Sequence, residues 1–245
     1  MNHTRRNRMK ILVIVAHPDD EVLGMGGTIK KLTKSNHEIK IVIMATGISA
    51  RRSTDFKNSS QYNVNKNKKD IMNKQIKTLK IHATKAAKLL GVSDIEFLNY
   101  PDNEMDKISN LELTKSVEGI IKKFKPETIY THTPFDVNVD HVSCYNAVLT
   151  ATRPKKNTIV KKVMSFEVPS SSEWNFTSIF TPNTFVDISH ELKHKIKALE
   201  CYKTELQKYP HPRSAKALQA IGNRWGTVSG FSVAEAFSLV RLLED

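Results

Sequence analysis

A histidine and three acidic residues directly follow an apolar segment near the start of the chain, as His17-Pro18-Asp19-Asp20-Glu21. Charged groups placed behind an apolar strand are costly unless they are paired or bind a cation. Imidazole nitrogen and carboxylate oxygen are ligand types that Zn²⁺ accepts. The i, i+3 spacing lets His17 and Asp20 turn inward together if the chain enters a helical turn there. Asp19 would then be free to act as a general base, unless these residues only cap the following helix.

A second polar cluster follows a later apolar segment and runs from His132 to His141. A catalytic zinc takes about three protein ligands and keeps one position open, and His17, Asp20 and His141 supply that number. Asp140 is placed to contact a ligand or the base on the side away from the metal and to hold it in position. Strand geometry decides whether His132 reaches the site. The alternative for His141 alone is a residue at a helix N-terminus that binds no metal.

A zinc centre with an open position predicts hydrolysis. Zinc lowers the pKa of a bound water toward neutrality and polarises a substrate carbonyl. Asp19 would take the proton of the water and return it to a leaving amine. The residues by themselves therefore predict cleavage of an amide or an ester, without deciding between them.

The segments before these clusters have the composition of buried strands. Residues 10–16 form an apolar, β-branched run, which is typical of a strand buried on both faces of a parallel sheet. Residues 38–45 repeat the pattern after glycines and a short helical segment, so the two strands and the helix form a βαβ unit with a right-handed crossover. Ligand sites in open parallel sheets lie beyond the carboxyl ends of strands, where both clusters stand.

Later apolar runs and periodic patterns predict the rest of the sheet and its helices. The predicted strands are residues 95–100, 127–132, 162–168 and 184–188, and the predicted helices are about 72–90, 111–124 and 142–152. Residues 47–70 predict a long polar loop, and the C-terminal third is expected to be mainly helical. We expect an α/β fold with a Rossmann-like, mostly parallel sheet, helices on both faces and a helical C-terminal elaboration. Residues 10–245 would form one domain after a basic flexible tail, residues 1–9.

The net charge of +13 invites a nucleic-acid or anionic-membrane interpretation. The excess is concentrated, because residues 1–10 carry four basic residues and no acid, and residues 51–90 carry eleven basic against two acidic residues. Nucleic-acid binding would need aromatic side chains among those lysines. Residues 51–90 hold only Phe56 and Tyr62 as aromatic rings, so the support for that class is thin.

The cysteine count and the apolar runs bear on the compartment. Two cysteines, Cys144 and Cys201, cannot build a disulfide framework and fit a reducing cytosol. The apolar run at residues 11–16 is too short to span a bilayer or to form a signal-peptide core. We therefore expect a cytoplasmic protein without a membrane partner.

The string from Val15 to Glu21, followed by Gly24, Gly26 and Gly27, resembles the signature of the LmbE/PIG-L family of zinc-dependent N-acetyl-sugar deacetylases. The resemblance extends over nearly the whole chain. The other segments that resemble the family are residues 46–51, 87–92, 100–102, 136–141, 210–214 and 234–237. Together they are specific, whereas each alone would be a moderate signal.

The resemblance implies a role for each matching position. His17, Asp20 and His141 would be the ligands of one zinc or another divalent metal per chain, and Asp19 the base. Arg51 would contact a sugar or a phosphate of the substrate, and its alternative is a solvated loop arginine. The implied activity is removal of acetyl from an N-acetylglucosamine-type conjugate. The basic loop that begins at Arg51 favours an anionic aglycone.

Two departures from the family pattern bear on the site. Asn138 stands where some members have a histidine that stabilises the oxyanion, and asparagine can donate a hydrogen bond but not a proton. We keep Asn138 as a catalytic residue, with His132 and His211 as the substrate-side residues that would take over the missing role. Leu79 and His82 stand where the family often has an arginine and a glutamate. The salt bridge or site support that the arginine and glutamate give in the family is therefore in doubt for this chain.

Two other functional classes remain open at the level of sequence. One is a basic nucleic-acid-binding protein with a degenerate metal site, and the other is a non-catalytic carbohydrate-binding protein. A pure binder has no need of Asp19 as a base, which favours the enzyme. We expect a small-molecule substrate and no nucleic-acid partner, and the resemblance is compatible with a homo-oligomer because the family often assembles.

Overall fold

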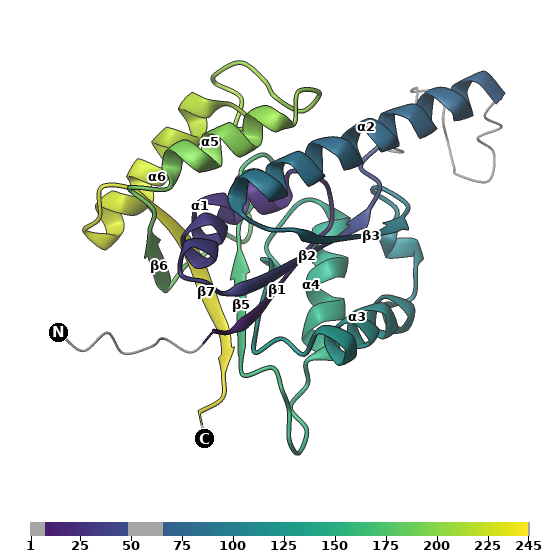
Figure 1. Ribbon diagram of the computed structural model, residues 1–245, viewed down its shortest axis with the longest axis horizontal. Coiled ribbons are helices and arrows are strands. Elements are labelled where there is room, and N and C mark those ends of the chain that lie inside the picture. Colours follow the sequence, from purple (N-terminus) through teal and green to yellow (C-terminus); the bar gives the residue numbers. More distant parts are fainter. Residues whose placement is uncertain (1–7, 49–65, 245) are drawn as a thin grey trace.

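The computed structural model describes residues 8–48 and 66–244. Within these residues, seven strands form one sheet in the order β3-β2-β1-β4-β5-β7-β6 (Figure 1). The strands are β1 (Lys10–Val15), β2 (Glu38–Ala45), β3 (Asp94–Tyr100), β4 (Thr128–His132), β5 (Lys162–Phe166), β6 (Thr184–Asp187) and β7 (Ala234–Leu242). The predicted tail, residues 1–9, lies mostly outside the described residues.

Helices follow most of the strands along the chain. They are α1 (Asp20–Lys34), α2 (Lys66–Leu90), α3 (Asn110–Phe124), α4 (Val139–Ala151), α5 (Leu192–Cys201) and α6 (Ala215–Ser229), with short 3-10 turns η3 (Met105–Lys107) and η4 (Ser172–Trp174). None of the helices in the described ranges combines the length and apolarity needed to cross a membrane.

The strand directions confirm the predicted, mostly parallel sheet. Strands β1 to β5 pair in parallel, whereas β7 runs antiparallel to both β5 and β6. The chain leaves β1 toward β2 on one side, and β4 pairs with the other side of β1. The order of the sheet therefore reverses between β1 and β4, and open α/β sheets bind ligands at such a switch point.

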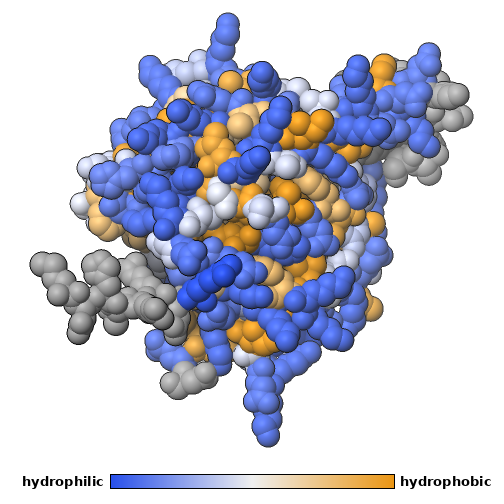
Figure 2. Space-filling view, in the orientation of Figure 1, coloured by the Kyte–Doolittle hydropathy of each residue, from blue (hydrophilic) through white to orange (hydrophobic). Residues whose placement is uncertain are grey.

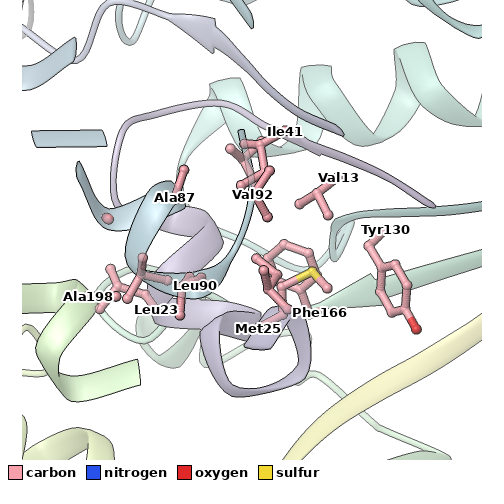
Figure 3. Packing of buried hydrophobic residues seen from close by; sticks show 14 of the residues in the cluster. Val13, Leu23, Met25, Ile41, Ala87, Leu90, Val92, Tyr130, Phe166 and Ala198 are labelled. Atoms are coloured by element: carbon pink, nitrogen blue, oxygen red, sulfur yellow. The ribbon is translucent and has the colours of Figure 1, made fainter. Parts of the chain in front are cut away.

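Apolar side chains of the central strands pack against helices on both faces of the sheet. Val13 of β1 lies in a core cluster with side chains of α1, α2 and α5, and Figure 3 shows Leu23, Met25, Ala87 and Ala198 of these helices in that cluster. The alternate residues of β1 pack in a second cluster with side chains of α3 and α4. Since both faces are covered, the strand can be apolar without interruption, as its sequence is.

Helix α2 shows the predicted amphipathic pattern. Leu79 and Leu90 are buried on the face toward the core, while Lys74, Lys77 and Lys85 are exposed. The helix extends past the edge of the sheet (Figure 1), and its outer part is mostly hydrophilic in Figure 2. Much of the described basic charge is therefore solvated.

The C-terminal part contains more strand than its sequence pattern predicts. Residues 234–237 suggest a helix, with Glu235 as an exposed or capping acid, but the structure places them in β7 with Glu235 only 3% exposed. Pairing with β5 and β6 on either side supplies backbone hydrogen bonds, and such tertiary pairing outweighs local helix propensity.

Candidate metal centre and active site

The two polar clusters meet at the switch point of the sheet. The chain leaves β1 at Val15 and reaches His17 two residues later, while the neighbouring β4 ends at His132 and is followed by the turn into α4. Asn138 caps α4 by accepting a hydrogen bond from the amide of Asp140 at 2.9 Å. The cap sets the first turn of α4, so that His141 faces the end of β1.

His17, Asp20 and His141 bring one ligand atom each to a common point. His17 Nδ1 lies 3.3 Å from His141 Nε2 and 3.5 Å from Asp20 Oδ2, and His141 Nε2 lies 3.3 Å from Asp20 Oδ2. A tetrahedral zinc with bonds of about 2.0–2.1 Å would hold its ligand atoms about 3.3–3.4 Å apart. The spacing of the three atoms therefore fits zinc.

Carboxylates hold the other ring nitrogen of each histidine. His17 Nε2 lies 3.0 Å from both Asp102 Oδ1 and Asp140 Oδ2, and His141 Nδ1 lies 2.9 Å from Asp136 Oδ2. Such pairs fix the tautomer and the ring orientation of metal-binding histidines and make them stronger ligands. Each histidine is thus oriented with its free nitrogen toward the common point.

A second group of three, His17 with Asp102 and Asp140, also has ligand atoms within 4.8 Å of one another. The Asp140 carboxylate, however, already accepts hydrogen bonds from the amides of Asn103 and Met105, at 2.6 and 2.9 Å. Both oxygens of Asp140 therefore already accept a backbone hydrogen bond, whereas Asp20 Oδ1 has no hydrogen-bond partner among the described residues. Among the described groups, the one with Asp20 is the better metal site.

The environment of the centre favours positive charge. Asp20 is 1% exposed, and its Oδ1 has no hydrogen-bond partner among the described residues. Burial pushes the pKa of Asp20 up, but the charge of His141 and hydrogen bonds from His141 and His17 bring it well below its usual value. Burial lowers the pKa of His141, yet the charge of Asp20 and the bond to Asp136 raise it to about 9. A buried anion with a free oxygen beside two histidines suits a cation.

Asp19 lies beside this centre in an unusual backbone conformation, with φ 106 and ψ −21. Its carboxylate is 1% exposed, and Arg213 Nε lies 2.9 Å from its Oδ2. The two groups are not aligned as a hydrogen bond, so the contact is an ion pair. Burial raises the pKa of Asp19, Arg213 opposes the rise, and the result is about 7. A carboxyl with such a pKa can both accept and return a proton near neutral pH.

A cavity of about 250 Å³ opens onto these groups. It is lined by His17, Pro18, Asp19, Gly47, Leu79, Asp102, Asn103, Asn138, His141, Ser170, Ser171, Glu205 and Arg213. A substrate in this cavity would therefore touch Asp19 and both histidines at once. The cavity brings together a candidate cation site, a buried carboxyl group and hydrogen-bonding groups.

The other predicted catalytic residues take different positions. Asn138 lines the cavity, and its Oδ1 accepts the hydrogen bond of the helix cap. Asp140 is fully buried, and its Oδ2 lies 3.0 Å from His17 Nε2, so its predicted role is to hold that ring rather than to contact a substrate. The catalytic role of Asn138 stays a prediction.

Two predicted substrate contacts do not lie on the cavity, and one falls outside the described residues. His132 is 0% exposed, its Nε2 accepts a hydrogen bond from the amide of Ala16 at 2.8 Å, and its ring stacks on His141 at 4.0 Å. The predicted contact between His132 and the substrate is therefore wrong. Burial lowers the pKa of His132 to about 3. His211 accepts from the amide of Arg213 at 3.1 Å and is not among the lining residues. Arg51 lies outside the described residues.

Several residues that contact the site were given no role by the sequence pattern alone. Arg213 lies in the segment 210–214 that resembles the family, but only folding brings it to Asp19, far away in the sequence. Asp136 accepts hydrogen bonds from Ser171 and Ser172 at 3.0 and 2.5 Å. These serines tie the segment after β5 to the turn before α4. No local spacing links those two segments, so the sequence held no signal for the contact.

Residues 12–152 match the family described as "PIG-L: GlcNAc-PI de-N-acetylase". The match begins in β1 and ends directly after α4, so it spans all three predicted metal ligands.

Several curated proteins are similar to this chain in sequence. The diacetylchitobiose deacetylase of Thermococcus kodakarensis is 26% identical over 238 residues, which cover 94% of this chain and 83% of that protein. The probable N-acetyl-alpha-D-glucosaminyl L-malate deacetylase 2 of Bacillus cereus is 26% identical over 200 residues, which cover 80% of this chain and 84% of that protein.

Solved structures share the fold. The N,N'-diacetylchitobiose deacetylase from Pyrococcus horikoshii aligns with a TM-score of 0.72 at 21% identity, covering 96% of this chain and 85% of that chain. GalB, the 4-carboxy-2-hydroxymuconate hydratase from Pseudomonas putida KT2440, aligns with a TM-score of 0.72 at 19% identity, covering 97% and 99%. Likeness at such identities shows the fold alone, and the fold carries a hydratase as well as a deacetylase.

Proposed function

Because this chain belongs to the PIG-L family, whose match spans residues 12–152, we propose that it is a zinc-dependent hydrolase that removes acetyl from an N-acetylglucosamine-type conjugate. The family and the curated relatives are deacetylases, hydrolases of amide C–N bonds, and this chain is an enzyme of that kind. Zinc, the roles of the site residues and the substrate are the proposed part.

One observation carries the proposal. The ligand atoms of His17, Asp20 and His141 lie 3.3–3.5 Å apart. Both histidines line a cavity that Asp19 also lines. A site with three protein ligands beside a cavity leaves room for a water and a carbonyl oxygen, which is the arrangement of a catalytic rather than a structural zinc. A non-catalytic sugar-binding protein would gain nothing from this arrangement beside a buried acid.

The chain's own residues have the following roles. His17, Asp20 and His141 hold the metal, and bound zinc would polarise the acetyl carbonyl and make the attacking water more acidic. Asp19 takes a proton from that water and returns it to the sugar nitrogen as the C–N bond breaks, releasing acetate and the free amine. Arg213 holds the Asp19 carboxylate in place through the ion pair at 2.9 Å.

Asn138 is the residue of the described cavity wall that we assign to the oxyanion. Its Oδ1 is engaged by the helix cap, so its Nδ2 is free to donate a hydrogen bond to the oxygen of the acetyl group. A donor aimed at the developing charge stabilises the transition state. Asparagine supplies no proton, so the proton for the leaving amine comes from Asp19.

The substrate class follows from the relatives' names. The two relatives described above are named for diacetylchitobiose and for N-acetyl-alpha-D-glucosaminyl L-malate, and both names contain an N-acetylglucosamine unit. Within the described lining, Arg213 is paired with Asp19, and Asp102 and Glu205 add carboxylates. We retain the anionic aglycone as a proposal that depends on Arg51.

Acetate release from purified protein tests the function. Zinc content is measured first, and N-acetylglucosaminyl malate, UDP-N-acetylglucosamine, diacetylchitobiose and a neutral N-acetylglucosaminide are then compared. We expect one zinc per chain, acetate release that a chelator abolishes, and recovery with added zinc. Zinc binding without acetate release from any of the four would contradict the deacetylase. Equal rates on charged and neutral substrates would remove the anionic aglycone.

We also propose a cytoplasmic location, a homo-oligomeric state and the absence of a nucleic-acid partner. Cys144 and Cys201 are both free, which suits a reducing compartment. Sizing chromatography with light scattering measures the oligomeric state. A salt-dependent gel shift with DNA or RNA near physiological salt would support the competing nucleic-acid class.

A further inference from the structure

Asp19 occupies a backbone region that L residues other than asparagine and aspartate seldom adopt. Its φ of 106 and ψ of −21 lie on the left-handed side. Such a conformation persists only where the surroundings fix it. Because it decides where the Asp19 carboxylate points, the groups that fix it matter for the chemistry.

Glu21 holds the backbone of Asp19. Its Oε2 accepts a hydrogen bond from the amide of Asp19 at 3.2 Å, and the carbonyl of Asp19 accepts from the amides of Val22 and Leu23 at 3.0 and 2.9 Å. Both sides of the Asp19 residue are therefore tied to the first turn of α1. The Glu21 side chain is 0% exposed, so its own position depends on protein groups.

Tyr202 holds Glu21. Its hydroxyl donates to Glu21 Oε1 at 2.5 Å, across 181 positions of sequence. Tyr202 is 0% exposed at the end of α5, and its ring lies edge-on to His82 of α2 at 6.5 Å between centroids. It does not line the cavity. The hydroxyl can therefore reach the reaction only through Glu21.

We propose that Tyr202 is a positioning residue, which acts through the Glu21 carboxylate to keep Asp19 in its left-handed conformation with the carboxylate toward the cavity. This role rests on the proposed function of Asp19. Removing the hydroxyl leaves Glu21 free to rotate, and the Asp19 amide then loses its acceptor. The zinc ligands and the substrate-binding groups keep their own contacts, so turnover falls while metal and substrate binding do not.

Tyr202→Phe tests the proposal, with Tyr130→Phe as the matched control. Both tyrosines are buried in the same core cluster, but Tyr130 lies on β4 and packs against Phe237. We expect Tyr202→Phe to lower kcat by about 10- to 100-fold with KM and zinc content unchanged, and to speed hydrogen exchange at the Asp19 amide. Tyr130→Phe should change neither. A Tyr202→Phe enzyme with the kcat and exchange of the control overturns the proposal.

Glu21→Gln gives a second measurement that does not depend on the folding of Tyr202→Phe. The glutamine oxygen can still accept from the Asp19 amide, while its amide donates to the Tyr202 oxygen. Glu21→Gln should therefore lose less kcat than Tyr202→Phe, and an equal or larger loss speaks against the proposal. If the wild-type protein releases no acetate, the proposed function fails, yet exchange at the Asp19 amide still decides whether Tyr202 holds it.

Discussion

At the scale of single residues, two acids that are neighbours in the sequence face different groups. Asp20 turns toward the two histidines, whereas Asp19 turns toward the cavity and Arg213. Asp19 stands in a left-handed conformation directly before α1, whereas Asp20 is the first residue of that helix, and adjacent side chains at a helix start do not face each other. Adjacent acids can thus serve as ligand and as base.

Changing Asp19 to Asn tests this division. An amide cannot take a proton from water, so we expect kcat to fall by about 100- to 10,000-fold. Zinc content should stay at the wild-type value, because the three ligands are untouched. Acetate release and metal analysis on the same preparation measure both. Retained turnover would show that another group is the base.

The support of His141 by Asp136 gives a second test at this scale. Asp136→Asn removes the charge that faces His141 Nδ1 at 2.9 Å. We expect zinc affinity to weaken by about 10- to 100-fold, because groups behind a metal ligand tune its strength. Competition with a zinc-binding dye measures the affinity. Asp106→Asn, at an exposed position on η3, is the matched control and should bind zinc like the wild type.

At the scale of elements, the start of α1 is pressed closely against the sheet. A Cβ at Gly24 would lie 2.2 Å from the ring of Phe166, at the end of β5. Phe166 also borders His132, which stacks on His141. Only glycine lets α1 come near enough to bring Asp20 beside the end of β4.

Replacing Gly24 by Ala tests this packing. The buried ring has no room to move, so we expect a loss of about 1–3 kcal/mol in the free energy of unfolding. Gly119→Ala in α3 is the contrasting variant, since nothing lies within 4 Å of a Cβ there. Alanine should stabilise that helix by up to about 1 kcal/mol. Urea denaturation of both variants measures the difference, and equal stabilities would refute the close approach.

At the scale of the whole molecule, the last strand is joined to the first helix. The Glu235 carboxylate on β7 accepts from the amides of Gly27 and Thr28, at 2.9 and 2.6 Å, and pairs with Lys195 of α5 at 2.6 Å. α1 is irregular at Met25, so these amides begin its second segment without helical partners. One buried carboxylate therefore supplies the missing acceptors.

Glu235→Ala should destabilise the fold strongly. It leaves Lys195, which is 6% exposed, as a buried charge without its partner, and breaking such a pair costs about 3–5 kcal/mol. Glu118→Ala removes a carboxylate from an exposed pair with Lys115 on α3 and should change stability little. Urea denaturation compares the two, and similar losses would contradict the structural role of Glu235.

The sheet was largely predictable from the chain. The apolar run that became β1, and the helical spacing that buries Leu79 and Leu90 of α2, depend on local periodicity, which the sequence displays directly. β7 could not be predicted in this way, because Ala234 to Leu242 becomes a strand by pairing with β5 and β6. Both partner strands are distant in the sequence, and no local sequence pattern predicts that β7 pairs with them.

The sequence by itself singled out the residues that we propose as the three ligands and the base, since each directly follows a recognisable strand or stands at the start of the helix beyond it, and strand ends meet at one edge of a parallel sheet. Only the tertiary structure decided that His132 is buried behind His141, and that Arg213 and Tyr202 reach Asp19 and Glu21. Residue type and spacing fix chemistry over a few positions, whereas contacts across nearly 200 positions depend on how the elements pack.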